Sequence, residues 1–171
     1  MPNDEADASA GGAGAPPPKD EQNRASTELT REYSGDGIRV HWYAGRCVHV
    51  AECIRALPHV FNPKQRPWVN LSAPEANADA VADAVLRCPT GALHFVRTDG
   101  GPQEVAAEPV TAKPIPKGPL LLRGDIEVFD EAGQLVRHDT RVAICRCTKS
   151  KHMPFSDNSH RAKVHIDLTP S

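Results

Sequence analysis

The sequence predicts an α+β protein made of a small α/β body followed by a small β-rich body, with a disordered N-terminal tail. Three observations support this. Over residues 36–98 the hydrophobic residues switch between strand spacing and helix spacing. Residues 99–117 are rich in Pro and Gly, and residues 118–171 contain short strand-like segments. With 12 Gly and 16 Pro among 171 residues, the chain is too irregular for a long helical bundle.

The composition of residues 1–34 predicts the disordered tail. The segment contains the run Pro16-Pro17-Pro18 and several glycines, and its acidic residues outnumber its basic ones. Leu29 is its only residue among Leu, Ile, Val and Phe. Such a segment buries too little apolar surface to offset the entropy lost on ordering.

The first body, residues 36–98, is expected to alternate strands and helices. Ile38, Val40 and Trp42 alternate with Arg39 and His41, which is typical of a strand. A short helix is expected at 53–57, and strands are expected at 67–71 and 92–96. Between these strands we expect a helix whose apolar face contains Ala78, Val81, Ala82 and Val85. Ser72 and Glu75 are expected to form a capping box before it.

An extended linker is expected at 99–117, because each Pro there fixes the backbone and removes a hydrogen-bond donor. The second body, residues 118–171, is expected to be β-rich. Its predicted strands are 120–122 and 126–129, separated by Arg123-Gly124-Asp125, then 142–144 and a last strand at 164–166.

Charge and composition exclude several classes of function. The formal net charge of −2 gives no global basic field for nucleic acid or an anionic membrane. No apolar run approaches the length of a membrane span, and the acidic N-terminus does not resemble a secretory signal. The five cysteines are an odd number, which favours free or metal-bound thiols in the cytoplasm over a disulfide framework. No catalytic triad or carboxylate pair is evident, so we expect no enzyme activity.

Three cysteines of the first body have a spacing that suits an iron–sulfur cluster. Five residues separate Cys47 from Cys53, and 34 separate Cys53 from Cys88, which precedes Pro89. A tight loop that supplies several thiolates, followed by a distant Cys-Pro, is typical of such sites. Spacing alone leaves three buried thiols as an equal alternative.

The residues around these cysteines resemble the divergent mono-cluster ferredoxin family over about residues 38–97. The resemblance rests on the segments Cys47–Cys53, Leu57-Pro58-His59-Val60-Phe61, Pro67-Trp68-Val69 and Arg87-Cys88-Pro89-Thr90-Gly91-Ala92-Leu93. It implies a ferredoxin-like α/β fold and one [3Fe-4S] or [4Fe-4S] cluster held by Cys47, Cys53 and Cys88. Val50 occupies the middle position of the loop and cannot bind iron. His49 is the nearest candidate for a fourth ligand, unless it is a surface residue or supports a ligand.

The second body contains Cys145, Cys147, Ser156 and His160 in a string that resembles the CDGSH iron–sulfur domain over about residues 118–165. The resemblance implies a [2Fe-2S] cluster held by Cys145, Cys147 and His160, with Ser156 in the position of the third Cys. Three states remain open: a cluster bound through the Ser156 oxygen, a single metal ion, or no metal. Asn158 replaces the usual Gly, and Asp157 is expected to cap the turn that carries His160.

Together these patterns predict a one-electron carrier that works with a separate redox protein, either a reductase or an acceptor. The first alternative is cluster transfer, storage, or redox or pH sensing, the last through protonation of His160. The second alternative is an interaction module with structural zinc-type sites. Neither nucleic acid nor membrane is an expected partner, and the sequence does not indicate an oligomeric state.

Overall fold

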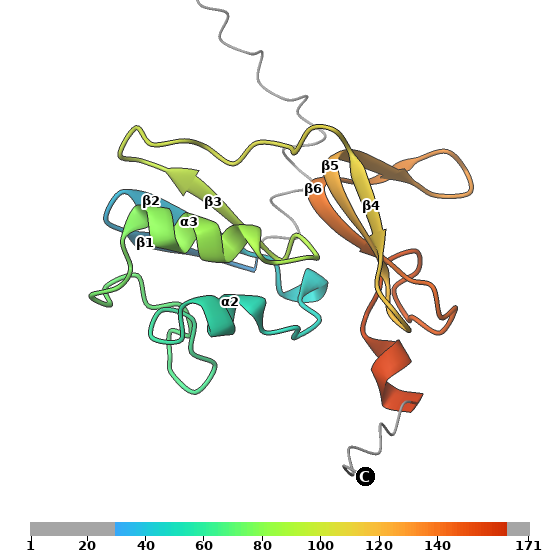
Figure 1. Ribbon diagram of the computed structural model, residues 1–171, viewed down its shortest axis with the longest axis horizontal. Coiled ribbons are helices and arrows are strands. Elements are labelled where there is room, and N and C mark those ends of the chain that lie inside the picture. The colour runs from blue at the N-terminus through green and yellow to red at the C-terminus, as the bar shows by residue number, and fades with distance from the viewer. Residues whose placement is uncertain (1–29, 164–171) are drawn as a thin grey trace, which may run out of the picture.

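The computed structural model describes residues 30–163 (Figure 1). It contains two antiparallel three-stranded sheets and few helices, which confirms the predicted α+β class. The first sheet has the strand order β1-β2-β3, from β1 (Arg31–Gly35), β2 (Ile38–Trp42) and β3 (Leu93–Arg97). The alternation predicted for β2 is observed, since Ile38 and Val40 are buried and Arg39 is exposed.

Strand β1 corrects the boundary of the predicted tail. Its residues fall within 1–34, yet they pair with β2 from Arg31 opposite Trp42 to Gly35 opposite Ile38. One inward ring holds the strand, because Tyr33 is buried and makes an edge contact with Trp68. An edge strand that buries one side chain leaves almost no hydrophobic pattern in the sequence. Residues 1–29 lie outside the described residues.

The helices of the first body are η1 (Ala44–Arg46), α2 (Glu52–Ala56) and α3 (Ala78–Leu86), and α3 packs across the first sheet (Figure 1). The apolar face of α3 buries Val81 and Val85 in the core. The predicted capping box is wrong. Asn77 is the N-cap residue, and its side chain accepts a hydrogen bond from the backbone N–H of Ala80 at 2.9 Å. Asn77 directly precedes the periodic apolar residues, where a cap is needed.

The predicted strand at 67–71 is reduced to a single bridge between Phe61 and Val69. Pro67 has no N–H to donate to a ladder, so the segment cannot extend the sheet there. The segment pairs instead with the residues just before it, through hydrogen bonds from Asn62 to Trp68 and from Asn70 to Val60.

The second sheet consists of β4 (Thr111–Pro114), β5 (Leu120–Phe129) and β6 (Leu135–Ile144), in that order. Strand β4 lies within the predicted linker, where all four of its residues are exposed and give no hydrophobic signal. The two strands predicted around Gly124 are one strand, β5. Gly124 has φ 138° and forms an irregularity in the ladder where the sequence suggested a turn.

The second sheet buries little apolar surface, since its buried apolar residues are Ile126, Val142 and Ala143. Two charged side chains of β6, Asp139 and Arg141, are buried beside them. The last described element is the short helix η2 (Ser159–Lys163), and the predicted strand at 164–166 lies outside the described residues. Between residues 30 and 163, no helix is long and apolar enough to cross a membrane.

Candidate metal centres

The loop that carries Cys47 and Cys53 is curled by two left-handed residues. Cys47 follows η1, and Cys53 lies in the first turn of α2. Between them His49 has φ 55° and Ala51 has φ 65°. Non-glycine residues in this conformation are strained by about 1–2 kcal/mol each and cluster at ligand sites.

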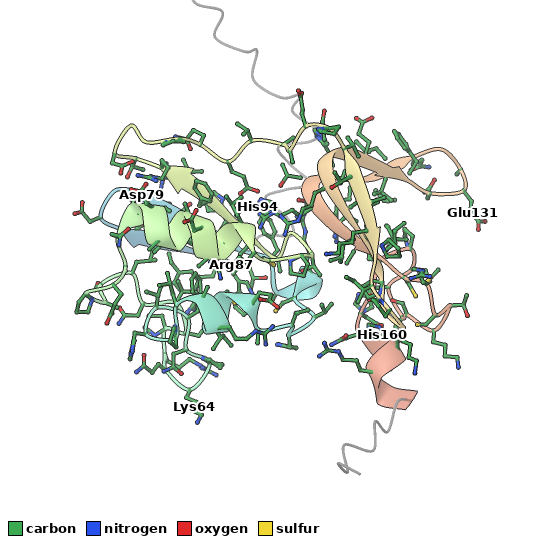
Figure 2. All side chains as sticks on the ribbon, viewed as in Figure 1. Lys64, Asp79, Arg87, His94, Glu131 and His160 are labelled. Carbon is green, nitrogen blue, oxygen red and sulfur yellow. The ribbon has the colours of Figure 1, made fainter. Side chains whose placement is uncertain are left out.

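Cys47, Cys53 and Cys88 line one cavity, together with Trp42 and Trp68. Cys88 reaches it from the end of α3, next to Arg87, which is labelled in Figure 2. The structure therefore brings the three predicted ligands of the first site together. The cavity volume is about 30 Å³, room for about one water molecule. A cluster is larger than this space, and the three thiols that line it are half-buried.

Two of the three thiols, Cys47 and Cys53, have a raised pKa. Burial, followed by the charges of Cys88 and Cys47, raises the pKa of the Cys53 thiol to about 12. Burial also raises the pKa of Cys47. Such thiols lose their protons only when positive charge replaces them, and metal ions supply that charge to sulfur ligands.

Two indole groups also fit an anionic sulfur-rich ligand. The Nε1 atoms of Trp42 and Trp68 are buried, and neither has an acceptor in the part of the chain that the structure describes. An indole N–H only donates, so a buried one without an acceptor costs about 1–3 kcal/mol. Sulfide or thiolate sulfur in the adjoining cavity would supply the acceptor. The donor set and the lining therefore fit an iron–sulfur cluster.

His49 lines the same cavity, with its Nδ1 atom 3.9 Å from the Sγ atom of Cys47. This distance suits a hydrogen bond to the sulfur, so His49 is placed to support Cys47. Among the described residues, no three His, Cys, Asp or Glu side chains converge on a point that would hold a single ion. The thiolates of a cluster bind different irons and need not converge in this way.

The second site begins where β6 ends. The Sγ atoms of Cys145 and Cys147 lie 3.5 Å apart. Two thiolates on one tetrahedral ion, with bonds of about 2.3 Å, lie roughly 3.8 Å apart. Burial raises the pKa of Cys145, but hydrogen bonds from the backbone of Ser150 and from Cys147 outweigh it and lower that pKa. The spacing of the pair fits two ligands of one metal ion.

Ser156 is brought back to the same end of β6. Its backbone N–H donates to the carbonyl of Ala143 at 2.8 Å, and its side chain is 9 % exposed. Asp157 accepts hydrogen bonds from the backbone N–H groups of Lys151 and Ser159, as expected of a cap, and these lower its pKa. His160, labelled in Figure 2, follows in η2 and is half-buried.

Comparison with known proteins agrees with both sites. Residues 33–98 match the family described as "Divergent 4Fe-4S mono-cluster". The uncharacterized protein YjdI of Escherichia coli K12 is 32 % identical over 65 residues, which cover 83 % of YjdI and 38 % of this chain, and YjdI of strain O157:H7 matches equally. The chain belongs to the divergent 4Fe-4S mono-cluster family. Its mono-cluster domain is followed by residues 117–161, which match "Iron-binding zinc finger CDGSH type".

The predicted fusion of a mono-cluster domain with a CDGSH-type domain is confirmed, as are iron–sulfur cofactors. The protein is an iron–sulfur binding protein. No solved structure matches the chain. The individual ligands, Cys47, Cys53, Cys88, Cys145, Cys147, Ser156 and His160, remain predictions.

A charged network between the mono-cluster domain and the CDGSH-type domain was missed by the sequence analysis. Arg46 pairs with Asp139 at 2.9 Å, and His94 lies 3.0 Å from Glu104 and 3.4 Å from Asp139. Burial opposes the charged form of His94, but the hydrogen bonds to Asp139 and Glu104 raise its pKa to about 9. One sequence signal was available, since Asp139 and Arg141 share the inward period of Ala143 along β6.

The two predicted cluster loops also touch. The side-chain amide of Asn158 donates to the carbonyl of Val48 at 3.0 Å. Beside this contact lies a cavity of about 290 Å³ that Cys47 and Ser156 both line. Asn158 has φ 70°, the left-handed conformation expected at a position where the CDGSH family usually has Gly.

Proposed function

We propose that the protein is a one-electron carrier with a [3Fe-4S] or [4Fe-4S] cluster in the mono-cluster domain and a [2Fe-2S] cluster in the CDGSH-type domain. The observation that supports this most strongly is the shared cavity of Cys47, Cys53 and Cys88, which two indole N–H donors adjoin. When bound, an iron–sulfur cluster accepts and releases one electron, and the protein sets its potential and accessibility.

Each group around the first cavity has a part in this proposal. The three thiolates would bind iron, and Trp42 and Trp68 would exclude water and donate hydrogen bonds to sulfur. In the second domain Cys145, Cys147 and His160 would hold the cluster, and the Ser156 oxygen would occupy the position of the third thiolate. His49 supports Cys47 from 3.9 Å.

We further propose that the protein itself is not an enzyme and exchanges electrons with a separate redox protein in the cytoplasm. All five cysteines are free thiols, which supports a reducing compartment. The predicted clusters lie at loops near the surface, where a partner has access.

The decisive experiment is iron and acid-labile sulfide analysis of protein purified without oxygen. The wild type is expected to hold about 5–6 iron per chain, with sulfide, if both domains are loaded. Cys88→Ser should reduce the iron bound by the mono-cluster domain and leave the iron of the CDGSH-type domain unchanged. About 3–4 iron would show that only the mono-cluster domain is loaded. Zinc without sulfide would contradict the proposal and favour structural metal sites.

Ser156 favours a second candidate function, in which the CDGSH-type domain releases its cluster to an acceptor. A hydroxyl is a harder and weaker ligand for iron than a thiolate. Ser156→Cys should therefore lengthen the half-life of the second cluster in the presence of a chelator, while the first cluster is unaffected. An unchanged half-life would show that Ser156 does not limit retention.

A further inference from the structure

The helix that leads to Cys88 has no cation in its last turn, and its C-cap residue is Arg87. Helix α3 stops at Leu86, and its last turn contains no basic residue. Arg87, which follows, is exposed (Figure 2). A helix C-terminus bears unsatisfied carbonyls and about half a negative charge. This negative end immediately precedes a thiolate that the proposed function assigns to an anionic cluster.

Two arginines of the CDGSH-type domain bind the carbonyls at the end of α3. Arg123 on β5 donates to the carbonyl of Leu86 at 3.0 Å. Arg141 on β6 donates to the carbonyl of Val85 and, at 3.2 Å, to that of Cys88. Arg141 also donates to the carbonyl of Leu93 at 2.8 Å, on the strand that follows the Cys88 turn. The peptide on each side of the Cys88 turn is thus held from the other domain.

The placement of these two arginines opposes sheet stability. Arg123 and Arg141 are direct cross-strand partners, and like charges opposite one another destabilise a sheet. Arg141 is 2 % exposed, so its charge is costly to bury unless paired. Glu104 pairs with Arg141 at 2.6 Å, but no carboxylate between residues 30 and 163 pairs with Arg123.

The charges around Arg123 show which groups its guanidinium interacts with. Burial and the charge of Arg141 both lower the pKa of Arg123, and the charge of the Cys88 thiolate acts in the opposite direction. Arg123 therefore carries a half-buried positive charge whose described anionic neighbours are the end of α3 and Cys88. A structural salt bridge would have placed a carboxylate there.

We propose that Arg123 and Arg141 form an electrostatic clamp that the CDGSH-type domain applies to the first cluster, holding the Cys88 turn and stabilising the reduced state. The clamp rests on the proposed function in that a cluster must occupy the first cavity. When an external one-electron donor reduces that cluster, its charge becomes more negative by one, and no bond to the protein forms or breaks. Two nearby guanidinium groups favour the more negative state, so they raise the reduction potential.

The test is an anaerobic redox titration of the first cluster in the full chain, followed by EPR. Arg123→Gln is expected to lower the equilibrium constant for reduction of the first cluster about tenfold, which lowers its reduction potential by ~59 mV for one electron. Arg123→Lys keeps the charge and should keep the potential. Lys113→Gln removes the same charge from exposed β4 in the same domain, and it should leave the potential unchanged.

The outcomes separate the clamp from the proposed function. Iron and sulfide are measured first, and a wild type without them would contradict the proposed function and, with it, the clamp. A loaded Arg123→Gln protein with the wild-type potential would overturn the clamp alone. An equal fall in reduction potential in Arg123→Lys would also overturn the clamp, because the positive charge would then not be the cause. Urea unfolding of each variant shows whether the domains remain folded.

Discussion

Trp42 and Trp68 each have a buried indole N–H without a described acceptor beside the first cavity. We predict that Trp68→Phe lowers the reduction potential of the first cluster and shortens its half-life in air, because a smaller aromatic ring remains but the donor to sulfur is lost. Potentiometry and the decay of the visible absorbance measure the two effects.

Tyr33 provides a matched control for that substitution. Its hydroxyl is also buried without a described partner, and its ring contacts Trp68, but it does not line the cavity. Tyr33→Phe should leave the potential unchanged and stabilise the fold slightly, since an unsatisfied polar group is removed. Equal effects of the two substitutions on the cluster would refute the hydrogen-bonding role of Trp68.

His94 makes the stability of the docked domains depend on pH. Its pKa is raised to about 9 by Asp139 and Glu104, against burial, with Arg46 and Arg141 as the other charged groups of the network. The folded pKa lies above the ordinary value of 6.5, so this stabilisation is complete below about pH 6.5 and is lost as the pH rises through 9. The loss should be roughly 3 kcal/mol.

Urea unfolding between pH 6 and pH 10 measures this loss. His94→Gln should flatten the profile in that range, because the amide does not titrate. A wild-type protein that is equally stable at pH 6 and pH 9.5 would contradict the prediction. Glu104 affects stability on the acid side of the profile. Its pKa is lowered to about 2, so the stability it contributes is lost only as the pH falls below about 4.5.

At the scale of elements, Gly124 fixes the irregularity in β5. A Cβ atom there would lie 2.7 Å from Val110 Cγ2 and 2.9 Å from its Cα, at a φ of 138°. We predict that Gly124→Val destabilises the protein by about 2–4 kcal/mol, measured by thermal unfolding. Gly133→Asn in the β5–β6 turn is the control, since its Cβ meets open space and Asn tolerates φ 76°. Equal losses would show that crowding at Gly124 is unimportant.

The elements that the sequence predicted are those that bury a periodic face. Strands β2 and β3 and helix α3 have such faces, and each lies close to its predicted range. Strands β1 and β4 lie at sheet edges, with one buried residue and none, so hydrophobic periodicity could not reveal them. The segment 67–71 buries Val69 and Leu71 but lacks the donor at Pro67 that a strand requires.

At the scale of the whole molecule, Asn158 links the two predicted cluster loops through the carbonyl of Val48. Asn158→Gly keeps the left-handed backbone accessible and removes only the amide donor. We predict a loss of about 1 kcal/mol and faster hydrogen exchange in the loop at 47–53. The Arg46–Asp139 pair should keep the domains docked. Unchanged exchange in that loop would show that the link does not restrain it.

The convergence of Cys47, Cys53 and Cys88 on one cavity was predictable, because a tight loop followed by a distant Cys-Pro is a known pattern of cluster sites. The contacts that join the domains were not, because Arg46 and Asp139 are 93 residues apart and Asn158 and Val48 are 110 apart. A single sequence does not reveal which distant charges meet. Buried charges also resemble ordinary surface residues in composition, so Asp139 and Arg141 were not recognised as interface residues.

Strand β6 has one further consequence. Arg141 holds the first domain, and four residues later along the same chain Cys145 begins the second site. Side chains of a strand change sides with every residue, so one inserted residue between the two would turn either the guanidinium or the thiols to the opposite face. This short stretch therefore fixes the spacing between the contact with the first domain and the start of the second site, so an insertion within it would disrupt one of the two.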